Sequence, residues 1–252
     1  MLIVKLSGKA LNDSHALGAL FEELKTHNEQ AIIVHGGGVE VDKILGAFDL
    51  QSNKIDGIRV SPSEHMPYIT AALAGQCNKV LQAQAIAHGL NAVGLLCTDF
   101  NLCALTPYEA KFGQVASCSV KDSTLVKSLL NEGVTPVICS IGINEQGQLY
   151  NINADEVAAA IAIAFKAPLV FFSDVKGVLD QNGQVIELID SKNIEELIAA
   201  KVITDGMAVK VKNALSVAKQ SNNSVFIASI FDEQARHNLS KLRRIGTSVQ
   251  VW

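Results

Sequence analysis

Short apolar runs alternate with amphipathic stretches along most of the chain. The runs that predict strands are residues 2–6, 31–35, 91–96, 135–140, 169–173 and 224–229. The stretches that predict helices are residues 14–27, 63–88, 122–131, 154–165 and 207–219. This alternation is typical of crossover units that build a parallel sheet covered by helices. Polar turn segments at 144–148 and 180–184 add two expected hairpins.

Composition narrows the class of protein. The 252 residues are 48% hydrophobic and 18% charged, with a formal net charge of -4, which is typical of a globular protein and offers no basic tract for nucleic acid. The first apolar run is too short to span a bilayer, so we expect a cytoplasmic protein without membrane or nucleic-acid partners. Five cysteines without a C-x-x-C pair favour reduced thiols over disulfides or a zinc site.

Three consecutive glycines, Gly36, Gly37 and Gly38, end the run 31–35 and begin a predicted helix. Such a turn leaves backbone N–H groups uncovered at the positive end of a helix, which suits a phosphate or carboxylate oxygen. A tight turn without any ligand is the alternative. Neither G-x-x-x-x-G-K-[ST] nor G-x-G-x-x-G occurs, so a P-loop enzyme and an ordinary Rossmann dehydrogenase are disfavoured.

Polar residues also follow the first run, where Lys5 is succeeded by Ser7 and Gly8. Because ligands collect at the carboxyl ends of parallel strands, Lys5 and Gly8 are expected beside the triple glycine. Further along the chain, Asn153 is a candidate N-cap. Asp155 in the following turn could hold cationic groups.

The order of these segments resembles the amino acid kinase family over nearly all 252 residues. The opening strand with Lys5 matches, as do HGGG at 35–38, DGIRVSP at 56–62, NINAD at 151–155, SDVKGVL at 173–179 and ITDGMAVK at 203–210. Within the family, the resemblance is closest to members that phosphorylate N-acetyl-L-glutamate. One departure is visible, because the family's K-x-G-G is Lys5-Leu6-Ser7-Gly8 here.

The resemblance implies an α/β fold of three layers, in which an open, mostly parallel eight-stranded sheet lies between helices, as in carbamate kinase. It implies an amino-acid-binding and dimerisation lobe over 1–165 and a nucleotide-binding lobe over 166–252. A homodimer is expected. Some relatives carry an additional N-terminal helix that builds arginine-inhibited hexamers; this chain begins at the first strand, so we expect a dimer without that switch.

The implied activity is transfer of the ATP γ-phosphoryl group to the side-chain carboxylate of N-acetyl-L-glutamate, for arginine synthesis. A carboxylate needs no general base, so the problem is to bring two anions together. By resemblance, Lys5 and Lys210 reach the transferring group from opposite sides and Asp155 holds both ammonium groups. Gly8 and Gly37 would offer backbone N–H groups to the phosphoryl oxygens.

The resemblance also assigns the two substrates. Arg59 would fork onto the α-carboxylate of the amino acid, and Asn151, Gly37 and Gly38 would add polar and main-chain contacts. The nucleotide would contact Asp174, Val175, Lys176, Gly177, Val178, Leu179, Val202, Ile203 and Thr204. Mg²⁺ would be held mainly by the phosphates and water, without protein ligands. We expect His35 to be a hydrogen-bonded turn residue without a catalytic role.

Alternatives remain open at this point. An acceptor longer by one methylene, N-acetylaminoadipate, would keep the same lysines and change binding by only about 1 to 3 kcal/mol. The KLSG start by itself looks more like a uridylate kinase. A non-catalytic nucleotide-sensing module could dispense with Lys5, Asp155 and Lys210, so their joint presence favours catalysis.

Overall fold

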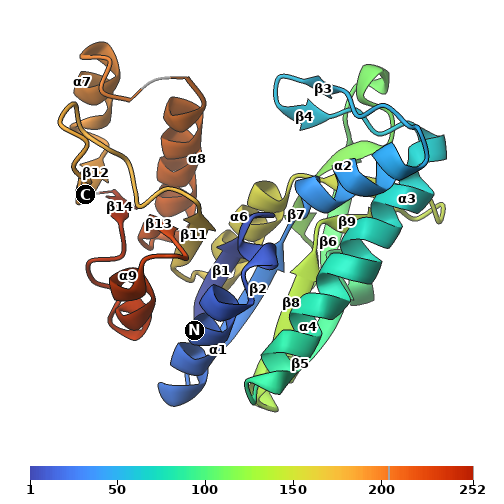
Figure 1. Ribbon diagram of the computed structural model, residues 1–252, viewed down its shortest axis with the longest axis horizontal. Coiled ribbons are helices and arrows are strands. Elements are labelled where there is room, and N and C mark those ends of the chain that lie inside the picture. Colours follow the sequence, from blue (N-terminus) through green and yellow to red (C-terminus); the bar gives the residue numbers. More distant parts are fainter. Residues whose placement is uncertain (204, 252) are drawn as a thin grey trace.

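The computed structural model describes residues 1–203 and 205–251, and its main element is an eight-stranded sheet (Figure 1). The strand order is β12-β14-β13-β11-β1-β2-β8-β5. The bounds in that order are Leu188–Asp190, Thr247–Gln250, Val225–Ser229, Leu169–Ser173, Leu2–Leu6, Ala31–His35, Val134–Cys139 and Asn91–Leu96. All neighbouring pairs are parallel except β13 and β14. The predicted fold class is therefore confirmed.

Helices cover both faces of this sheet. One face packs against α1 (Ser14–Thr26), α4 (Asn78–Ala87) and α9 (Glu233–His237). The other face packs against α5 (Thr124–Asn131), α6 (Ala154–Phe165) and α8 (Asp205–Ser221). Because successive side chains of a strand point to opposite faces, β1 sends Leu2, Val4 and Leu6 into the first layer and Ile3 into the second. The same alternation turns Lys5 toward α6.

Smaller elements complete the fold. A four-stranded sheet has the order β6-β7-β10-β9, with bounds Cys103–Pro107, Val115–Val120, Leu149–Ile152 and Ile141–Ile143. A two-stranded ribbon consists of β3 (Lys54–Ile55) and β4 (Ile58–Arg59). The remaining helices are α2 (Gly38–Ala47), α3 (Met66–Thr70) and α7 (Ile194–Ala199). Short 3₁₀ turns lie at Ala10–Asn12, Ser63–His65, Asp99–Asn101, Ala110–Phe112 and Leu239–Lys241.

Most predicted elements are present with boundary shifts of one or two residues. Residues 63–88 form a nearly continuous helical stretch, but Ala71–Cys77 within it is π-helical. Both hairpins are confirmed: β9 pairs antiparallel with β10, and Leu179 bridges Val185. The five cysteines are free thiols, as predicted. Within residues 1–203 and 205–251, none of the helices combines the length and apolar character needed to cross a bilayer.

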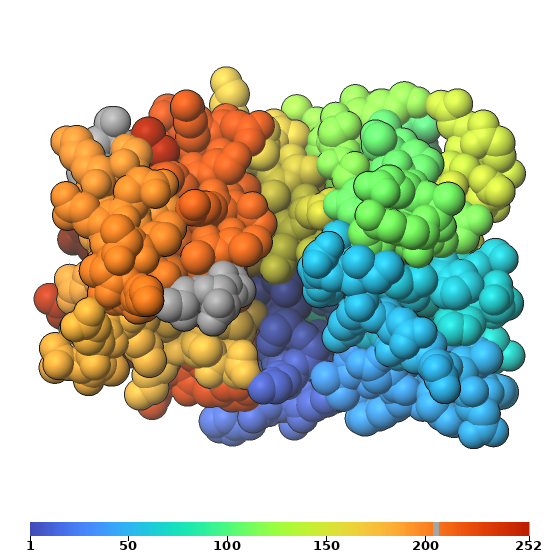
Figure 2. All heavy atoms as spheres, turned by 90° about the horizontal axis from the view of Figure 1, so that it is seen from above, coloured from blue at the N-terminus to red at the C-terminus, as the bar shows by residue number. Residues whose placement is uncertain are grey.

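The surface is hollowed at the carboxyl edge of the main sheet. Viewed from above, the hollow separates the orange part, which holds α7 and α8, from the blue-to-green part, and α6 in olive lies at its bottom (Figure 2). The polar segments that follow β1, β2 and β11 begin at this edge.

Candidate active site

Three central strands end level with one another. Leu6 of β1 stands beside His35 of β2 on one side and Phe172 of β11 on the other, so the loops after these strands share one edge. The two glycine turns touch there, because a Cβ at Gly8 would lie only 3.5 Å from the backbone nitrogen of Gly38. The structure thus brings together the two turns predicted to bind an anion.

Lys5 and Asp155 form an ion pair beneath these turns. Helix α6 begins at an N-cap, Asn153, whose side-chain oxygen accepts a hydrogen bond from the backbone N–H of Asp155 at 2.9 Å. This cap places Asp155 in the first turn, where its Oδ1 lies 2.8 Å from Lys5 Nζ. The Lys5 side chain is only 15% exposed, so its charge is screened less by solvent than that of a surface lysine.

Lys210 lies half-buried on α8, which packs against α6. Burial lowers the pKa of Lys210, as does the positive charge of Lys5, while the charges of Asp155 and Asp174 act in the opposite direction. Lys210 is therefore within electrostatic reach of both members of the Lys5–Asp155 pair. The structure gathers on one edge three groups that are more than 50 residues apart in the sequence.

Arg59 is a buried arginine whose guanidinium is held by three neighbours. It donates to the Asp42 carboxylate and to the Ser52 hydroxyl, and its Nη2 donates to the Gly38 carbonyl at 3.1 Å. The hydrogen bond from Arg59 is the main reason that the pKa of Asp42 is lowered. Since Gly38 and Asp42 both belong to α2, Arg59 is fixed to the helix that starts at the glycine turn.

Asn151 belongs to the same wall of the site. Its Nδ2 donates to the hydroxyl of the fully buried Ser61 at 3.1 Å, and that hydroxyl donates to the backbone carbonyl of Arg59 at 3.2 Å. Asn151 and Arg59 are thus linked through one buried serine. The two residues assigned to the amino acid are neighbours in space.

His35 is buried in the sheet directly before the glycines. Its Nδ1 lies 2.8 Å from the Gly36 carbonyl and its Nε2 lies 3.0 Å from Asn78 Nδ2. This network assigns the proton to Nδ1, which donates to Gly36, while Nε2 accepts from Asn78. Burial lowers the pKa of His35 from 6.5 to about 4, so the ring is neutral near pH 7. It holds the turn, as predicted.

The segment predicted to bind the nucleotide follows β11. Asp174 is exposed at its start, and Val178 donates its backbone N–H to the hydroxyl of Thr247 at 2.7 Å. Gly177 has φ of +157°, and a Cβ there would lie 2.8 Å from that hydroxyl oxygen. Glycine is therefore required where this segment crosses β14.

The other predicted nucleotide segment follows α7. The backbone N–H groups of Val202 and Ile203 both donate to the carbonyl of Leu197. Thr204 lies outside the described residues.

Several neighbours of the site escaped the sequence analysis. Lys9 forms an ion pair with Asp174 across the edge of the sheet. Because Lys9 directly follows Gly8 in a turn predicted to bind an anion, its place beside the site could have been predicted from the sequence. Asp42 lies one helical turn after Gly38, so an ion pair between its carboxylate and an arginine near the glycine turn could have been predicted. Ser61 belongs to the DGIRVSP segment, but nothing in that pattern indicated its contact with Asn151. No pattern in the sequence pointed to Ser52.

The chain is similar in sequence to known proteins over most of its length. The model of the amino acid kinase family matches residues 1–229. The chain belongs to the amino acid kinase family. An acetylglutamate kinase from Vibrio cholerae serotype O1 is 45% identical over 232 residues, which cover 90% of this chain and 88% of that one.

Solved structures show the same fold for this family member. The protein smu.665 from Streptococcus mutans UA159 superimposes with a TM-score of 0.83 at 28% identity, covering 99% of this chain and 98% of that chain. A carbamate kinase from Giardia superimposes with a TM-score of 0.70 at 15% identity, covering 100% of this chain and 99% of that chain. At that identity the second likeness concerns the fold alone.

Proposed function

We propose that this family member transfers the γ-phosphoryl group of ATP to the side-chain carboxylate of N-acetyl-L-glutamate, giving an acyl phosphate in arginine biosynthesis. The observation that carries the proposal is the Lys5–Asp155 pair, with Lys210 in electrostatic reach, at the edge where two glycine turns meet. Such an arrangement suits an anion that must be neutralised. The acetylglutamate kinase names of the relatives support this acceptor.

The acceptor half orients the amino acid. Arg59 would present its planar guanidinium, already held in place, to the α-carboxylate, a geometry that lysine does not reproduce, and Asn151 would bind a polar group of the acceptor. The side-chain carboxylate then needs no proton removed: one of its oxygens forms the new bond to phosphorus. The bond from phosphorus to the bridging oxygen breaks, and its electron pair leaves with ADP.

Charge neutralisation is the main contribution of the chain to the rate. Lys5 and Lys210 would stabilise the charge that spreads over the transferring oxygens, while Asp155 fixes where the Lys5 ammonium points. Backbone N–H groups of Gly8 and Gly37 would add donors that need no reorganisation. Each such donor contributes typically about 10²- to 10³-fold in rate, or about 3 to 4 kcal/mol.

The nucleotide half would bind ATP through Asp174 to Leu179 and through residues 202–204. The lysine ammonium groups and uncovered backbone N–H groups of this half suit the triphosphate, which carries several negative charges. Mg²⁺ would be held mainly by the phosphates and water and would offset part of their charge.

The proposal also covers the division of the chain into two lobes and its oligomeric state. Residues 1–165 would form the amino-acid-binding lobe and residues 166–252 the nucleotide-binding lobe, with two copies associating through the first. Sizing of the protein by light scattering checks this, because the expected mass is twice the 26.9 kDa of one chain.

Trapping of acyl phosphate with hydroxylamine tests the proposed function. With ATP and Mg²⁺, N-acetyl-L-glutamate should give hydroxamate, while glutamate, aspartate and N-acetylaminoadipate should give markedly less. Uridylate contains no carboxylate, so its phosphorylation is followed by ADP release. Stronger turnover with another acceptor would reassign the substrate, and nucleotide binding without turnover on any acceptor would favour a sensing module.

A further inference from the structure

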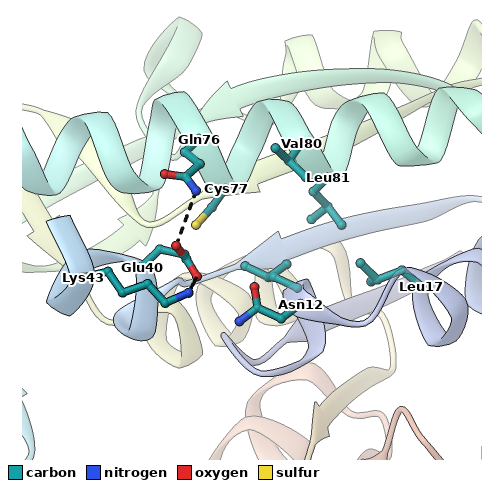
Figure 3. Close-up of a pocket in the computed structure, with 9 residues that line it drawn as sticks. Asn12, Leu17, Glu40, Lys43, Gln76, Cys77, Val80 and Leu81 are labelled. Carbon is teal, nitrogen blue, oxygen red and sulfur yellow. Dashed lines mark hydrogen bonds and ion pairs between the residues drawn. The ribbon is translucent and has the colours of Figure 1, made fainter.

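A cleft of about 210 Å³ lies behind the glycine turn, between the helical stretch that carries Gln76 to Leu81 on one side and α2, the 3₁₀ turn Ala10–Asn12 and α1 on the other (Figure 3). Figure 3 shows that its two ends differ in character. The residues that line it are Leu11, Asn12, Leu17, Glu40, Lys43, Gln76, Cys77, Val80 and Leu81. We call it the rear cleft. None of these residues has a role in the proposed transfer.

A carboxylate marks the polar end of the rear cleft. Glu40 is a buried residue in the first turn of α2. Its Oε1 lies 2.7 Å from Lys43 Nζ, and its Oε2 accepts a weak hydrogen bond from Gln76 Nε2 at 3.4 Å. The Lys43 side chain is 61% exposed, so its ammonium group can return to water at little cost.

The opposite end is lined by leucine and valine side chains from the 3₁₀ turn at Ala10–Asn12, from α1 and from α4, with the Asn12 side chain between this end and Lys43 (Figure 3). A ligand that satisfies both ends is positively charged at one end and apolar over the rest of its length. The volume is below the about 300 to 1,000 Å³ of sites for drug-sized molecules, so the ligand must be small.

We propose that the rear cleft binds a small organic cation, a primary ammonium group on a short apolar body. The ammonium group takes the place of the Lys43 side chain on the Glu40 carboxylate. The apolar body lies among Leu17, Val80 and Leu81. Recognition thus combines a charge-assisted hydrogen bond with burial of apolar surface.

The rear cleft adjoins the glycine turn through Cys77. A Cβ at Gly37 would lie 2.7 Å from Cys77 Sγ and 2.8 Å from Leu73 Cδ2, so these side chains pack directly against the turn. Both belong to the π-helical segment Ala71–Cys77, and single π turns occur frequently at functional sites. An occupant that touches Cys77 therefore acts on the backbone of Gly37. This link to turnover rests on the proposed function, whereas binding itself does not.

Methyl NMR of the whole chain tests the proposal, with 2-phenylethylammonium as the probe. The methyl signals of Leu11, Leu17, Val80 and Leu81 should shift in a saturable manner. Neutral 2-phenylethanol and anionic 3-phenylpropionate should leave them unshifted at the same concentrations. Equal shifts with the three compounds, or no shifts with the cation, would overturn the proposal.

Two variants move the affinity in opposite directions. Glu40→Gln keeps the shape and removes the charge, so the affinity for the probe should fall at least tenfold. Lys43→Met removes the internal competitor, so the affinity should rise at least threefold. Glu195→Gln, an exposed residue of α7, is the matched control and should bind like the original chain. Unchanged affinity in both Glu40→Gln and Lys43→Met would contradict the assignment, and a Glu40→Gln chain that fails to fold leaves Lys43→Met to decide.

Turnover tests the link to the glycine turn separately. Saturating probe should lower the rate of hydroxamate formation, and higher concentrations of ATP or acceptor should not restore it. An unchanged rate would overturn the link while the NMR result still decides the site. If the chain forms no acyl phosphate at all, only the proposed function fails.

Discussion

The proposed acceptor half and the proposed nucleotide half of the candidate site are organised differently. In the acceptor half, Arg59 is buried and held by three neighbours, Asn151 is held by a buried serine, and His35 fixes the first glycine of the turn. In the nucleotide half, the side chain of Asp174 is 46% exposed, and that of its partner Lys9, which reaches it from the turn after β1, is 67% exposed. The acceptor half is ordered by hydrogen bonds within the chain. The nucleotide half offers charges to solvent.

This difference has a physical reason. A small amino acid brings few contacts, so the groups that receive it must already be in place, since ordering them on binding would cost side-chain entropy. ATP carries several charges, and exposed cations gain most of their interaction energy only when the phosphates arrive. Lys5 and Lys210 lie between these extremes, because both are partly buried and both lie within electrostatic reach of Asp155. We therefore expect substitutions to have large effects near the buried groups and small effects near the exposed ones.

The largest effect is expected at the two lysines between the halves. Lys5→Ala and Lys210→Ala should each lower kcat about 10²- to 10³-fold, because each removes a cation that neutralises the transferring group. Nucleotide affinity, measured by calorimetry with a non-hydrolysable ATP analogue, should fall far less. Lys212→Ala, an exposed lysine on the same helix, is the control. Near-normal turnover of both variants would remove these residues from the mechanism.

The buried histidine should make the acceptor half sensitive to acid. His35 has a folded-state pKa of about 4 and an ordinary value of 6.5, so the unfolded chain binds the extra proton first and stability falls as the pH drops through this window. At about 1.4 kcal/mol per unit, the loss attributable to His35 is about 3 kcal/mol between pH 7 and pH 4. Urea unfolding over this range checks it. His35→Asn should show a shallower decline, and parallel curves for the two proteins would contradict the assignment.

Replacing the buried arginine should affect acceptor binding more than turnover. Arg59→Lys keeps one charge but loses the planar fork and leaves Asp42 or Gly38 without a donor, so KM for the acceptor should rise about 10- to 100-fold. Steady-state kinetics with varied acceptor measure this. Lys54→Met, whose position pairs with Arg59 in the β3–β4 ribbon, should leave KM near its original value. An unchanged KM in Arg59→Lys would show that the acceptor does not meet this side chain.

The smallest effect is expected at the exposed pair of the nucleotide half. Lys9→Ala should change the free energy of unfolding at pH 7 by less than about 1 kcal/mol, because exposed ion pairs contribute little. The hydrogen bond from Lys9 is the main reason that the pKa of Asp174 is lowered, so that pKa should rise in the variant, as NMR titration of the carboxyl carbon would report. A large loss of stability would mean that this half is also organised internally.

Much of this organisation could be predicted from the sequence. Strands such as 31–35 are continuous apolar runs bounded by polar turns. Lys5 and the glycines lie at the carboxyl ends of two predicted strands, so their meeting at one sheet edge follows from parallel topology. The approach of Asp155 to Lys5 was expected only from the family resemblance, because α6 follows a strand of the smaller sheet. β12 and β14 were missed because they are short and carry polar residues such as Asp190 and Gln250. The partners of Arg59 were missed because Asp42 and Ser52 come from other elements, and such pairing depends on tertiary packing that local patterns do not encode.

The central claim is that Lys5 and Lys210 act on one phosphoryl group, and a double-mutant cycle tests it most directly. Single-turnover hydroxamate formation is measured at saturating ATP and acceptor for the original chain, Lys5→Ala, Lys210→Ala and the double variant. Because two groups that neutralise the same charge do not contribute independently, the double loss should differ from the product of the single losses at least tenfold, or about 1.4 kcal/mol. Additivity within about 0.5 kcal/mol would contradict the claim.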